Sequence, residues 1–317
     1  MEYDLSIIVV NYNTEHLLAE MFSAVEAATG DLTVQKIVID NASRDGSVSL
    51  LRRTYPDVEL IANQENVGFG RANNQAIPLV RGEFVLLLNT DAFVSPGGIE
   101  RSVRFMRARP DCALLGVRLV GRDGSLQPSC RYFPTPWNEF LGRTGLARFF
   151  AGTRLVDDMS WDHASVRRCD WVPGCYLLIR KEVVDRIGLF DPRFFLYYEE
   201  VDLCMSLRKA GLQVMYFPDT TVVHIGGESA KSDAQLTANG RQISALQIES
   251  ALLFHRKHHG LAGLLLGVAL LALDDTVLYL KRLLRMKSSR ATAVAFSESR
   301  ATWSLLRRTA WGSGPTR

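Results

Sequence analysis

The chain has 317 residues, of which 47% are hydrophobic and 22% charged, and this composition excludes disorder over most of its length. Its formal net charge of +3 is too small to indicate a nucleic acid as a partner. The five cysteines are scattered, without the CxxC or Cys/His spacing of a zinc site, so we expect free thiols in a reducing compartment.

The N-terminal half alternates apolar runs with segments of helical spacing. Acidic Glu2 and Asp4 precede the first run and no basic segment does, so we expect no secretory signal peptide and a cytoplasmic catalytic part. Helices are predicted over residues 14–28 and 43–55, the second with Ser43 as its N-cap. Continuous apolar strands between helices indicate an α/β fold with a doubly wound, mostly parallel sheet and helices on both faces. The predicted strands are Leu5–Asn11, Val34–Asp40, Val58–Asn63 and Glu83–Asn89.

Polar residues follow each of these four strands. The segments that end them read NYNT, DNAS, NQENVGFG and NTDA. Ligands of open α/β sheets bind beyond the carboxyl ends of the strands, so we expect a binding site along this edge. No glycine follows the first strand and no GxxxxGK[ST] motif occurs, which excludes a Rossmann-type dinucleotide site and a P-loop. A nucleotide would therefore be held by side chains and a metal.

The regular alternation of predicted strands and helices ends after Ala92. A helix is predicted over residues 97–110 and a strand over 112–120, followed by an irregular stretch over about 121–170. Regular structure resumes over 171–184, and a helix that ends at Gly211 precedes a strand over 212–219.

Seven motifs run in order through about residues 5–229: SIIVVNYNT, VIDNASRDGS, NVGFGRANNQA, LLLNTDA, WVPGCYLLIRKEV, FDPRFFLYYEEVDLCMSLRKAG and VVHIGGES. In this order they resemble glycosyltransferase family 2, the inverting enzymes of the GT-A fold, and especially its bacterial rhamnosyltransferase-like members. The resemblance implies a GT-A catalytic domain over residues 1–250, with a nucleotide-binding half over 1–92 and an acceptor half over 93–250. Residues 251–317 would form a helical C-terminal tail.

Transfer from a nucleotide sugar requires that the charge of the departing diphosphate be neutralised. The resemblance implies a divalent cation, Mg²⁺ or Mn²⁺, bound by Asp91 and His224. Asn89 stands where the family has the first Asp of a DxD motif, which leaves one formal charge fewer. An amide oxygen can still bind such a cation or a sugar hydroxyl.

The resemblance also implies a pocket for the nucleotide sugar. Asp40 stands where the family's second strand carries an acidic residue that contacts the nucleoside. Asn11, Asn66, Arg71 and Asn74 would complete the pocket, with pairing to the diphosphate as the alternative for Arg71.

The second requirement is a base for the acceptor hydroxyl. The family pattern Glu-Asp-x-Asp, at the start of a helix, reads Glu199-Glu200-Val201-Asp202 here, so Glu200 is the expected base. Glu199 and Asp202 lie three residues apart on one helix face, and Asp202 is expected to orient the base or bind the acceptor. The simpler interpretation is that the three carboxylates only stabilise a helix N-terminus, by about 0.3–1 kcal/mol each. On the acceptor side the resemblance implies Trp171 and Gly174.

The C-terminal tail has its own pattern. Residues 261–273 are apolar without interruption, but these 13 residues are fewer than the about 20 of a spanning helix. The segment after them places Val277, Leu280 and Leu284 on one helical face, which predicts an interfacial helix on an anionic membrane. The alternative is a helical hairpin that mediates homo-oligomerisation. The basic residues of the other faces are Lys281, Arg282, Arg285 and Lys287.

These observations together predict an inverting glycosyltransferase that moves a sugar, such as rhamnose from dTDP-rhamnose, to a polyprenyl-linked or cell-surface glycan. It would act at the inner face of the plasma membrane. Two alternatives stay open from the sequence. One is a nucleotidyltransferase, and the other is a non-catalytic scaffold in glycan assembly, which is suggested by Asn89 and Glu200 because each stands where the family has Asp.

Overall fold

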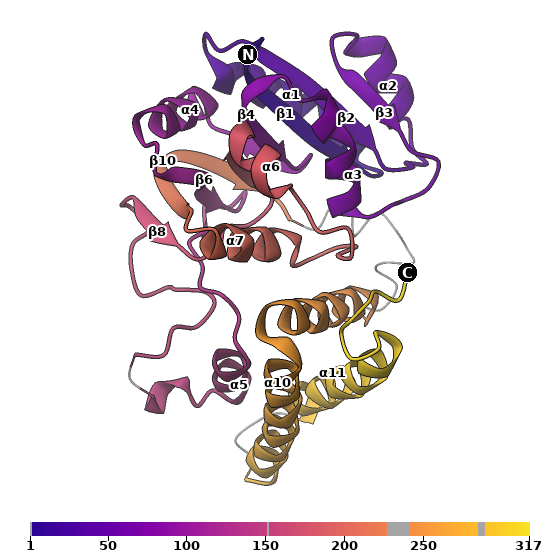
Figure 1. Cartoon of the computed structure of the whole chain (residues 1–317), viewed down its shortest axis with the longest axis vertical. Helices are drawn as coiled ribbons and strands as arrows, with labels where there is room; N and C mark the ends of the chain where they lie inside the picture. The colour runs from indigo at the N-terminus through magenta and orange to yellow at the C-terminus, as the bar shows by residue number, and fades with distance from the viewer. Residues whose placement is uncertain (1, 151, 227–240, 285–288) are drawn as a thin grey trace.

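One mixed β-sheet with helices on both faces forms the body of the protein (Figure 1). The computed structural model describes residues 2–150, 152–226, 241–284 and 289–317. Across these ranges the strands are β1 (Tyr3–Asn11), β2 (Val34–Asp40), β3 (Glu59–Ala62), β4 (Gly82–Leu88), β5 (Ala92–Val94), β6 (Cys112–Val120), β7 (Leu126–Gln127), β8 (Arg167–Cys169), β9 (Tyr176–Arg180) and β10 (Gln213–His224). The helices are α1 (Glu15–Thr29), α2 (Ser47–Thr54), α3 (Phe69–Ala76), α4 (Gly98–Ala108), α5 (Pro136–Thr144), α6 (Lys181–Ile187), α7 (Glu199–Lys209), α10 (Arg241–Leu283) and α11 (Ser289–Arg308), with 3₁₀ turns at Ile77–Leu79 and Ala147–Phe149.

The strand order is β3-β2-β1-β4-β9-β6-β10-β5, with β7 beside β6 and β8 beside β10. The first four strands pair in parallel, as their apolar runs predict. β9 then lies antiparallel between β4 and β6, so the second half of the sheet is mixed. The predicted α/β class with helices on both faces is confirmed, and the parallel pairing is concentrated in its N-terminal half.

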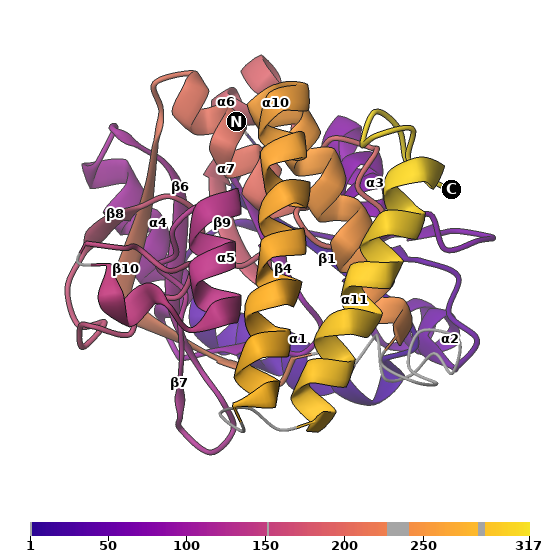
Figure 2. The ribbon, with the colours of Figure 1, turned by 90° about the horizontal axis from the view of Figure 1, so that it is seen from below.

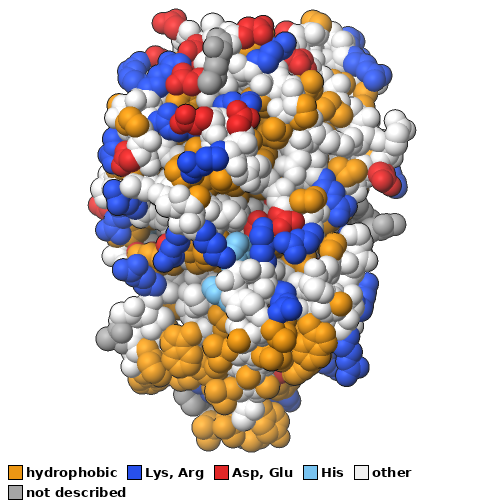
Figure 3. Space-filling view, in the orientation of Figure 1, with side chains coloured by type: hydrophobic (Ala, Val, Ile, Leu, Met, Phe, Trp, Pro, Cys, Tyr) orange, Lys and Arg blue, Asp and Glu red, His pale blue; other side chains and the backbone are white. Residues whose placement is uncertain are grey.

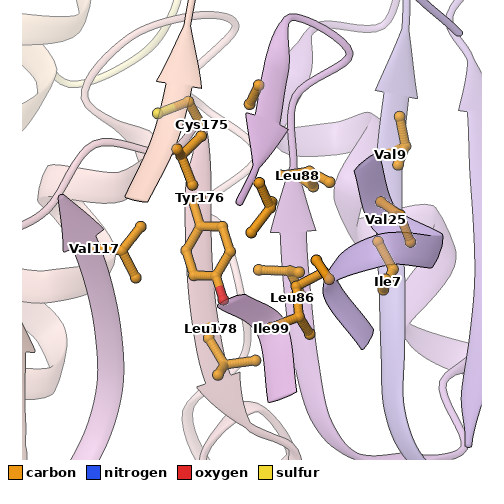
Figure 4. Packing of buried hydrophobic residues seen from close by; sticks show 14 of the residues in the cluster. Ile7, Val9, Val25, Leu86, Leu88, Ile99, Val117, Cys175, Tyr176 and Leu178 are labelled. Carbon is orange, nitrogen blue, oxygen red and sulfur yellow. The ribbon is translucent and has the colours of Figure 1, made fainter. Parts of the chain in front are cut away.

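Side chains that alternate along the strands build one core on each face of the sheet. Ile7 and Val9 of β1 point to the core under α1 and α4, whereas Ile8 points to the core under α3, α6 and α7. Figure 4 shows the first of these cores, in which the ring of Tyr176 lies beside Leu86 and Ile99. The two cores hold the carboxyl ends of the central strands rigidly in place.

The prediction of Ser43 as a helix N-cap is wrong. Helix α2 begins at Ser47, where the Asp45 carboxylate accepts hydrogen bonds from both the backbone N–H and the hydroxyl of Ser47. The Ser43 hydroxyl instead accepts from the Asn11 amide and from the backbone N–H of Asn13. Ser43 therefore ties the ends of the first two strands together.

The stretch predicted to be irregular contains a helix, α5. Its N-terminus has a reciprocal capping box, in which Thr135 and Asn138 each accept from the other's backbone N–H. Pro136 at the first helical position is a usual helix start, which the sequence interpretation missed. The side of α5 away from the sheet packs against α10, so this helix joins the C-terminal helices to the body of the protein.

The C-terminal helices α10 and α11 lie side by side below the sheet, with α5 on the other side of α10 (Figures 1 and 2). Helix α10 breaks at Gly260, whose φ is 69°. Before the break, Leu253 and Phe254 are buried in the core that also contains α7. After it, the residues predicted as a membrane-binding helix continue α10, although Arg285 and Lys287 lie outside the described residues.

Among the described residues, one helical stretch, Ala245–Leu283, is long enough to cross a membrane and contains an 18-residue window with a mean hydropathy of 2.0. Length and composition are weak grounds on their own. Figure 3 shows that hydrophobic side chains gather on the surface at this end of the molecule, below a region with many Lys and Arg side chains.

Candidate active site

The sheet topology brings Asp91 and His224 together. Asp91 comes between β4 and β5, and β5 pairs antiparallel with β10 so that Ala92 lies opposite His224. The closest atoms of the two side chains, Asp91 Oδ1 and His224 Nε2, are 3.6 Å apart. The other oxygen, Asp91 Oδ2, accepts from the backbone N–H of Gly226 at 3.1 Å. Two motifs that are 133 residues apart in the chain, 91 and 224, thus form one polar pair.

Gln127 of β7 determines which nitrogen of His224 carries the proton. Its Nε2 donates to the His224 backbone carbonyl at 2.9 Å, so its Oε1 is left as an acceptor, 3.1 Å from His224 Nδ1. Nδ1 therefore carries the hydrogen and Nε2 presents its lone pair toward Asp91. Burial lowers the pKa of His224, opposed by the Asp91 charge, and favours the neutral imidazole that binds metals.

A cavity of 320 Å³ lies along this edge of the sheet. Of the residues expected from the sequence, seven line it: Asn66, Asn89, Asp91, Gly174, Glu199, Glu200 and His224. The rest of its wall comes from Val10, Tyr12, Asn41, Gly68, Phe69, Thr90, Pro173, Cys175, Phe195, Leu196 and Tyr197. The ends of four strands (β1, β2, β4 and β10), the segment before β9 and the start of α7 therefore converge on one space.

The start of α7 is a strained turn that aims two carboxylates at this cavity. Tyr197 and Tyr198 have φ values of 72° and 68°, in the left-handed region that non-glycine residues seldom adopt. Glu199 is buried and Glu200 is half-buried, and each has one oxygen, Oε2, that no hydrogen bond satisfies. Buried polar atoms of this kind are usually satisfied by a bound ligand or by a proton.

Both carboxyl groups have a raised pKa. For Glu199 the causes are burial and then the neighbouring Glu200 charge. For Glu200 the cause is burial, opposed by backbone hydrogen bonds, including one from Gly174, and by the charge of Arg131. A carboxylate with a raised pKa is a stronger base than an ordinary glutamate.

Asp202, the third carboxylate of the motif, does not line the cavity. It is 3% exposed, and its oxygens contact Lys257 Nζ at 2.7 Å and His258 Nε2 at 2.6 Å, both from α10. Its role in the structure is to join α7 to α10.

The expected nucleotide residues fall into two groups. Asn66 lines the cavity and accepts a hydrogen bond from Asn41 at 2.8 Å. Asp40 and Asn11 are buried behind the wall and bond to each other at 2.7 Å, and Ser43 N–H donates to the second Asp40 oxygen at 2.9 Å. They hold the strand ends in register without lining the cavity.

Arg71 and Asn74 of α3 also lie outside the cavity lining. Arg71 Nε donates to the carbonyl of Pro192 at 2.7 Å. Asn74 donates to the Phe190 carbonyl at 2.7 Å and accepts from its N–H at 3.1 Å. Both residues fasten the segment that leads into the strained turn.

On the acceptor side, Gly174 and Trp171 are placed differently. Gly174 lines the cavity, and a Cβ atom there would lie 3.8 Å from Glu200 Cβ, so it sits directly against the expected base. Trp171 is 6% exposed, donates its indole N–H to the Tyr132 carbonyl, and belongs to the core. It offers no face to the cavity.

The residues at the cavity fit a divalent cation. Asp91 and the Nε2 lone pair of His224 supply one anionic oxygen and one nitrogen, and the buried Asn89 Oδ1 has no hydrogen-bond partner. Such oxygen and nitrogen donors suit Mn²⁺ and Mg²⁺. In the part of the chain that the structure describes, no three His, Cys, Asp or Glu side chains form a metal cluster, so the donor's phosphates would have to complete the shell.

Two residues of this site escaped the sequence analysis. Asn41 directly follows Asp40 in the DNAS segment, so its position at a strand end was a usable signal. Gln127 lies in the stretch predicted to be irregular, and no sequence pattern connects it with His224.

Comparisons with known proteins agree with this geometry. The sequence profile of Glycosyl transferase family 2 matches residues 6–167. An N-acetylglucosaminyl-diphospho-decaprenol L-rhamnosyltransferase of Mycobacterium tuberculosis is 29% identical over 248 residues, covering 72% of this chain and 78% of the relative. The rhamnosyltransferase WbbL of Escherichia coli is 24% identical, over 71% of this chain and 85% of its own.

Solved structures share the fold. A mannosyltransferase from Pyrobaculum calidifontis, in complex with GDP-Man and Mn²⁺, superposes with a TM-score of 0.57 at 16% identity, covering 99% of this chain and 88% of its own. GalNAc-T7, with UDP, GalNAc and Mn²⁺, has a TM-score of 0.55 at 13% identity over 80% of this chain and 47% of its own.

Proposed function

The chain belongs to glycosyl transferase family 2 and is a glycosyltransferase. We therefore propose that the 320 Å³ cavity is the active site, in which the enzyme transfers a sugar, with inversion, from a nucleoside-diphosphate donor to an acceptor hydroxyl. One observation carries the proposal: the Glu200 carboxylate, with a free oxygen, lines the same cavity as Asp91 and His224. A base and a site for the leaving group are thereby brought together in one space.

Glu200 is the general base of this reaction. Its carboxylate takes the proton of the acceptor hydroxyl, and the oxygen forms a bond to the anomeric carbon from the face opposite the phosphate. The bond between that carbon and the phosphate oxygen breaks, and the nucleoside diphosphate leaves with the electron pair. Glu199 lies beside the base, and the Glu200 charge, after burial, raises the pKa of Glu199.

Asp91, His224 and Asn89 are the residues that would hold a divalent cation on the diphosphate side. A bound cation neutralises the charge that grows on the departing phosphate. Gln127 keeps His224 in the tautomer that this requires, through the hydrogen bond to Nδ1. Asn41 and Asn66 lie at the end of the cavity where the nucleoside would bind.

For the substrates we propose rhamnose, from dTDP-rhamnose, and a lipid-linked glycan acceptor. The support comes from two relatives, both named rhamnosyltransferases, one of them for N-acetylglucosaminyl-diphospho-decaprenol.

We further propose that the enzyme works in the cytoplasm as a peripheral protein on the membrane. The outer side of α10 exposes Leu265, Leu266 and Leu273, while Asp274 on its inner side pairs with Arg143 of α5. This pairing ties the apolar helix to the catalytic domain, which supports a helix lying on the bilayer. Lys281 donates to the Thr144 carbonyl at the end of α5, so it serves this attachment as well.

The test is to supply the purified protein and Mn²⁺ with a panel of nucleotide sugars and a lipid-diphosphate N-acetylglucosamine acceptor. We expect dTDP-rhamnose to give a rhamnosylated lipid and dTDP. If only another donor supports transfer, the sugar of that donor is the one that the enzyme transfers, and not rhamnose. Release of the donor's sugar 1-phosphate in place of dTDP would indicate a nucleotidyltransferase, and the absence of any product with all donors would indicate a scaffold.

A further inference from the structure

A second cavity, of 480 Å³, lies between α5, α10 and α11, and the transfer chemistry does not use it. Pockets that bind drug-sized ligands measure about 300–1,000 Å³, so it is large enough for a substantial ligand. Helix α10 lines it on both sides of the break at Gly260, with Leu252 before the break and Leu264 after it. The three helices lie side by side in Figure 2.

The wall of this cavity suits an apolar ligand. Phe140 of α5 and Leu252, Leu264, Val268 and Leu271 of α10 contribute to it. A surface of this kind favours hydrocarbon over water.

The charged side chains in the lining are paired with one another. Arg143 Nε lies 2.5 Å from Asp274, and its Nη1 lies 3.6 Å from Glu298. His255 contacts Glu139 at 3.2 Å. Since each of these charged groups has an ion-pair partner in the lining, the cavity does not require a charged ligand.

The strained turn at the start of α7 separates this cavity from the catalytic one. Tyr198 lines the cavity between the helices, and its hydroxyl donates to Glu139 at 3.3 Å. The residues on either side of it, Tyr197 and Glu199, line the catalytic cavity, as does Glu200. The two left-handed residues thus turn successive side chains to opposite sides of one stretch of backbone.

The lining of the second cavity reaches from Tyr198 to Asp274, in the half of α10 whose outer side chains form the exposed apolar surface. Positions 264, 268 and 271 face the cavity, whereas Leu265, Leu266 and Leu273 are 45%, 54% and 48% exposed. One helix therefore has an apolar face toward solvent and another toward the cavity. The cavity lies between the expected membrane surface and the catalytic turn.

We infer that the cavity between α5, α10 and α11 binds the apolar chain of the acceptor lipid, so that its sugar reaches Glu200 past the Tyr197–Glu200 turn. The inference rests on the proposed function for the identity of the acceptor. It adds a binding site for the lipid itself, formed by a helix of the catalytic domain and the two C-terminal helices.

The test is a pair of matched substitutions on α10. Ala251 lines the cavity and Ala269 is exposed on the outside of the same helix. Ala251→Phe fills part of the cavity, whereas Ala269→Phe adds the same ring elsewhere. Val268→Phe fills it from the other half of α10 and replaces Ala251→Phe if that variant does not fold, as judged by thermal unfolding.

The first readout is binding of farnesyl phosphate, with isopentenyl phosphate as the short-chain reference, in detergent-free buffer. Burial of each methylene changes an equilibrium by about fourfold, so exclusion of two or three weakens binding by about 15- to 60-fold. We expect this loss in Ala251→Phe and less than a twofold change in Ala269→Phe. Equal affinity of the wild type for the two phosphates, or of Ala251→Phe and the wild type for farnesyl phosphate, overturns the inference.

The second readout separates this inference from the proposed function. With acceptors that carry the same sugar diphosphate on a long or a short chain, Ala251→Phe should raise the KM of the long-chain acceptor alone. If the wild type transfers sugar to neither acceptor but binds farnesyl phosphate in the cavity, the proposed function fails and the lipid site stands. If it transfers equally well to both, the lipid site is wrong.

Discussion

Glu200 combines burial with an unsatisfied oxygen, and this has a consequence for the pH dependence of the enzyme. Its pKa is raised above the ordinary value of 4.5, and the base must be ionised to accept a proton. Activity should therefore rise with pH through an apparent pKa above 4.5. Because burial causes this raised pKa, Glu199→Gln should leave this limb of the kcat/KM profile in place. A limb at or below pH 4.5 in the wild type would contradict the assignment.

Gln127 should control metal affinity without touching the substrate. Gln127→Leu removes the acceptor of the His224 Nδ1 proton, and loss of such a partner weakens metal binding by about 10- to 100-fold. The measurement is the Mn²⁺ concentration that gives half-maximal transfer. Gln127→Glu keeps an acceptor for Nδ1 and should retain most of the affinity. Equal Mn²⁺ dependence of the leucine variant and the wild type would exclude this role.

At the residue scale, the motifs predicted three residues that the structure brings to one cavity: Asp91 and His224 at strand ends and Glu200 at the start of a helix. The motifs did not distinguish residues that face the cavity from residues that support it. Asp40 and Asp202 carry charges in the right motifs, but hydrogen bonds to other elements turn them away. The sequence around Asp202 does not indicate a partner such as Lys257, which lies 55 residues further along the chain.

Among the elements, the junction of α7 with α10 depends on Lys257. Its Nζ contacts Asp202 at 2.7 Å and Asp191 at 2.8 Å, and removing one member of a largely buried pair leaves charges poorly compensated. Because Lys257 is 26% exposed, we expect Lys257→Ala to lower the free energy of unfolding by about 1–3 kcal/mol. Lys181→Ala removes an exposed helix pair and should cost about 0.5 kcal/mol or less. Urea denaturation measures the free energy of unfolding of both variants. Equal losses would show that the contacts of Lys257 stabilise the protein no more than the helix pair of Lys181 does.

The loop before α3 depends on Gly68. Its φ is 90°, and a Cβ there would lie 2.5 Å from the carbonyl oxygen of Phe195, which also accepts from the Phe69 N–H. Gly68→Ala combines backbone strain with this clash and should destabilise the protein by more than about 2 kcal/mol. Gly188→Ala, at a φ of 81° and a ψ of 177° with open space around it, should show the backbone strain alone, of about 1–3 kcal/mol, and a smaller loss than Gly68→Ala. Equal shifts in thermal unfolding would mean that the loop moves to avoid the clash.

Helix boundaries were predictable wherever apolar spacing was regular, as in α1 and α4. Helix α5 was not, because its capping box uses Asn138 in place of the usual Glu or Gln. The register of β5 against β10 was also beyond the sequence, although it is what joins Asp91 to His224. Long-range pairing is decided by the whole sheet.

For the molecule as a whole, the exposed side of α10 should decide membrane binding. Leu265→Glu together with Leu266→Glu places two charges on this face and should weaken binding to vesicles of anionic lipid by more than about tenfold. Leu79→Glu, on an exposed leucine of the 3₁₀ turn after α3, is the control. Co-sedimentation measures the fraction bound to vesicles. Equal binding of both variants would show that another surface binds the membrane, or that these leucines form an interface between copies of the chain.

The chemistry of the cavity is tested most directly by Glu200→Gln. The amide keeps the size of the side chain but cannot take the proton, so kcat for sugar transfer should fall by about 10²–10⁴ while the Kd of the nucleotide-sugar donor stays within twofold. Glu182→Gln, an exposed residue at the start of α6, should leave both quantities unchanged. Unaltered turnover in Glu200→Gln would contradict Glu200 as the base.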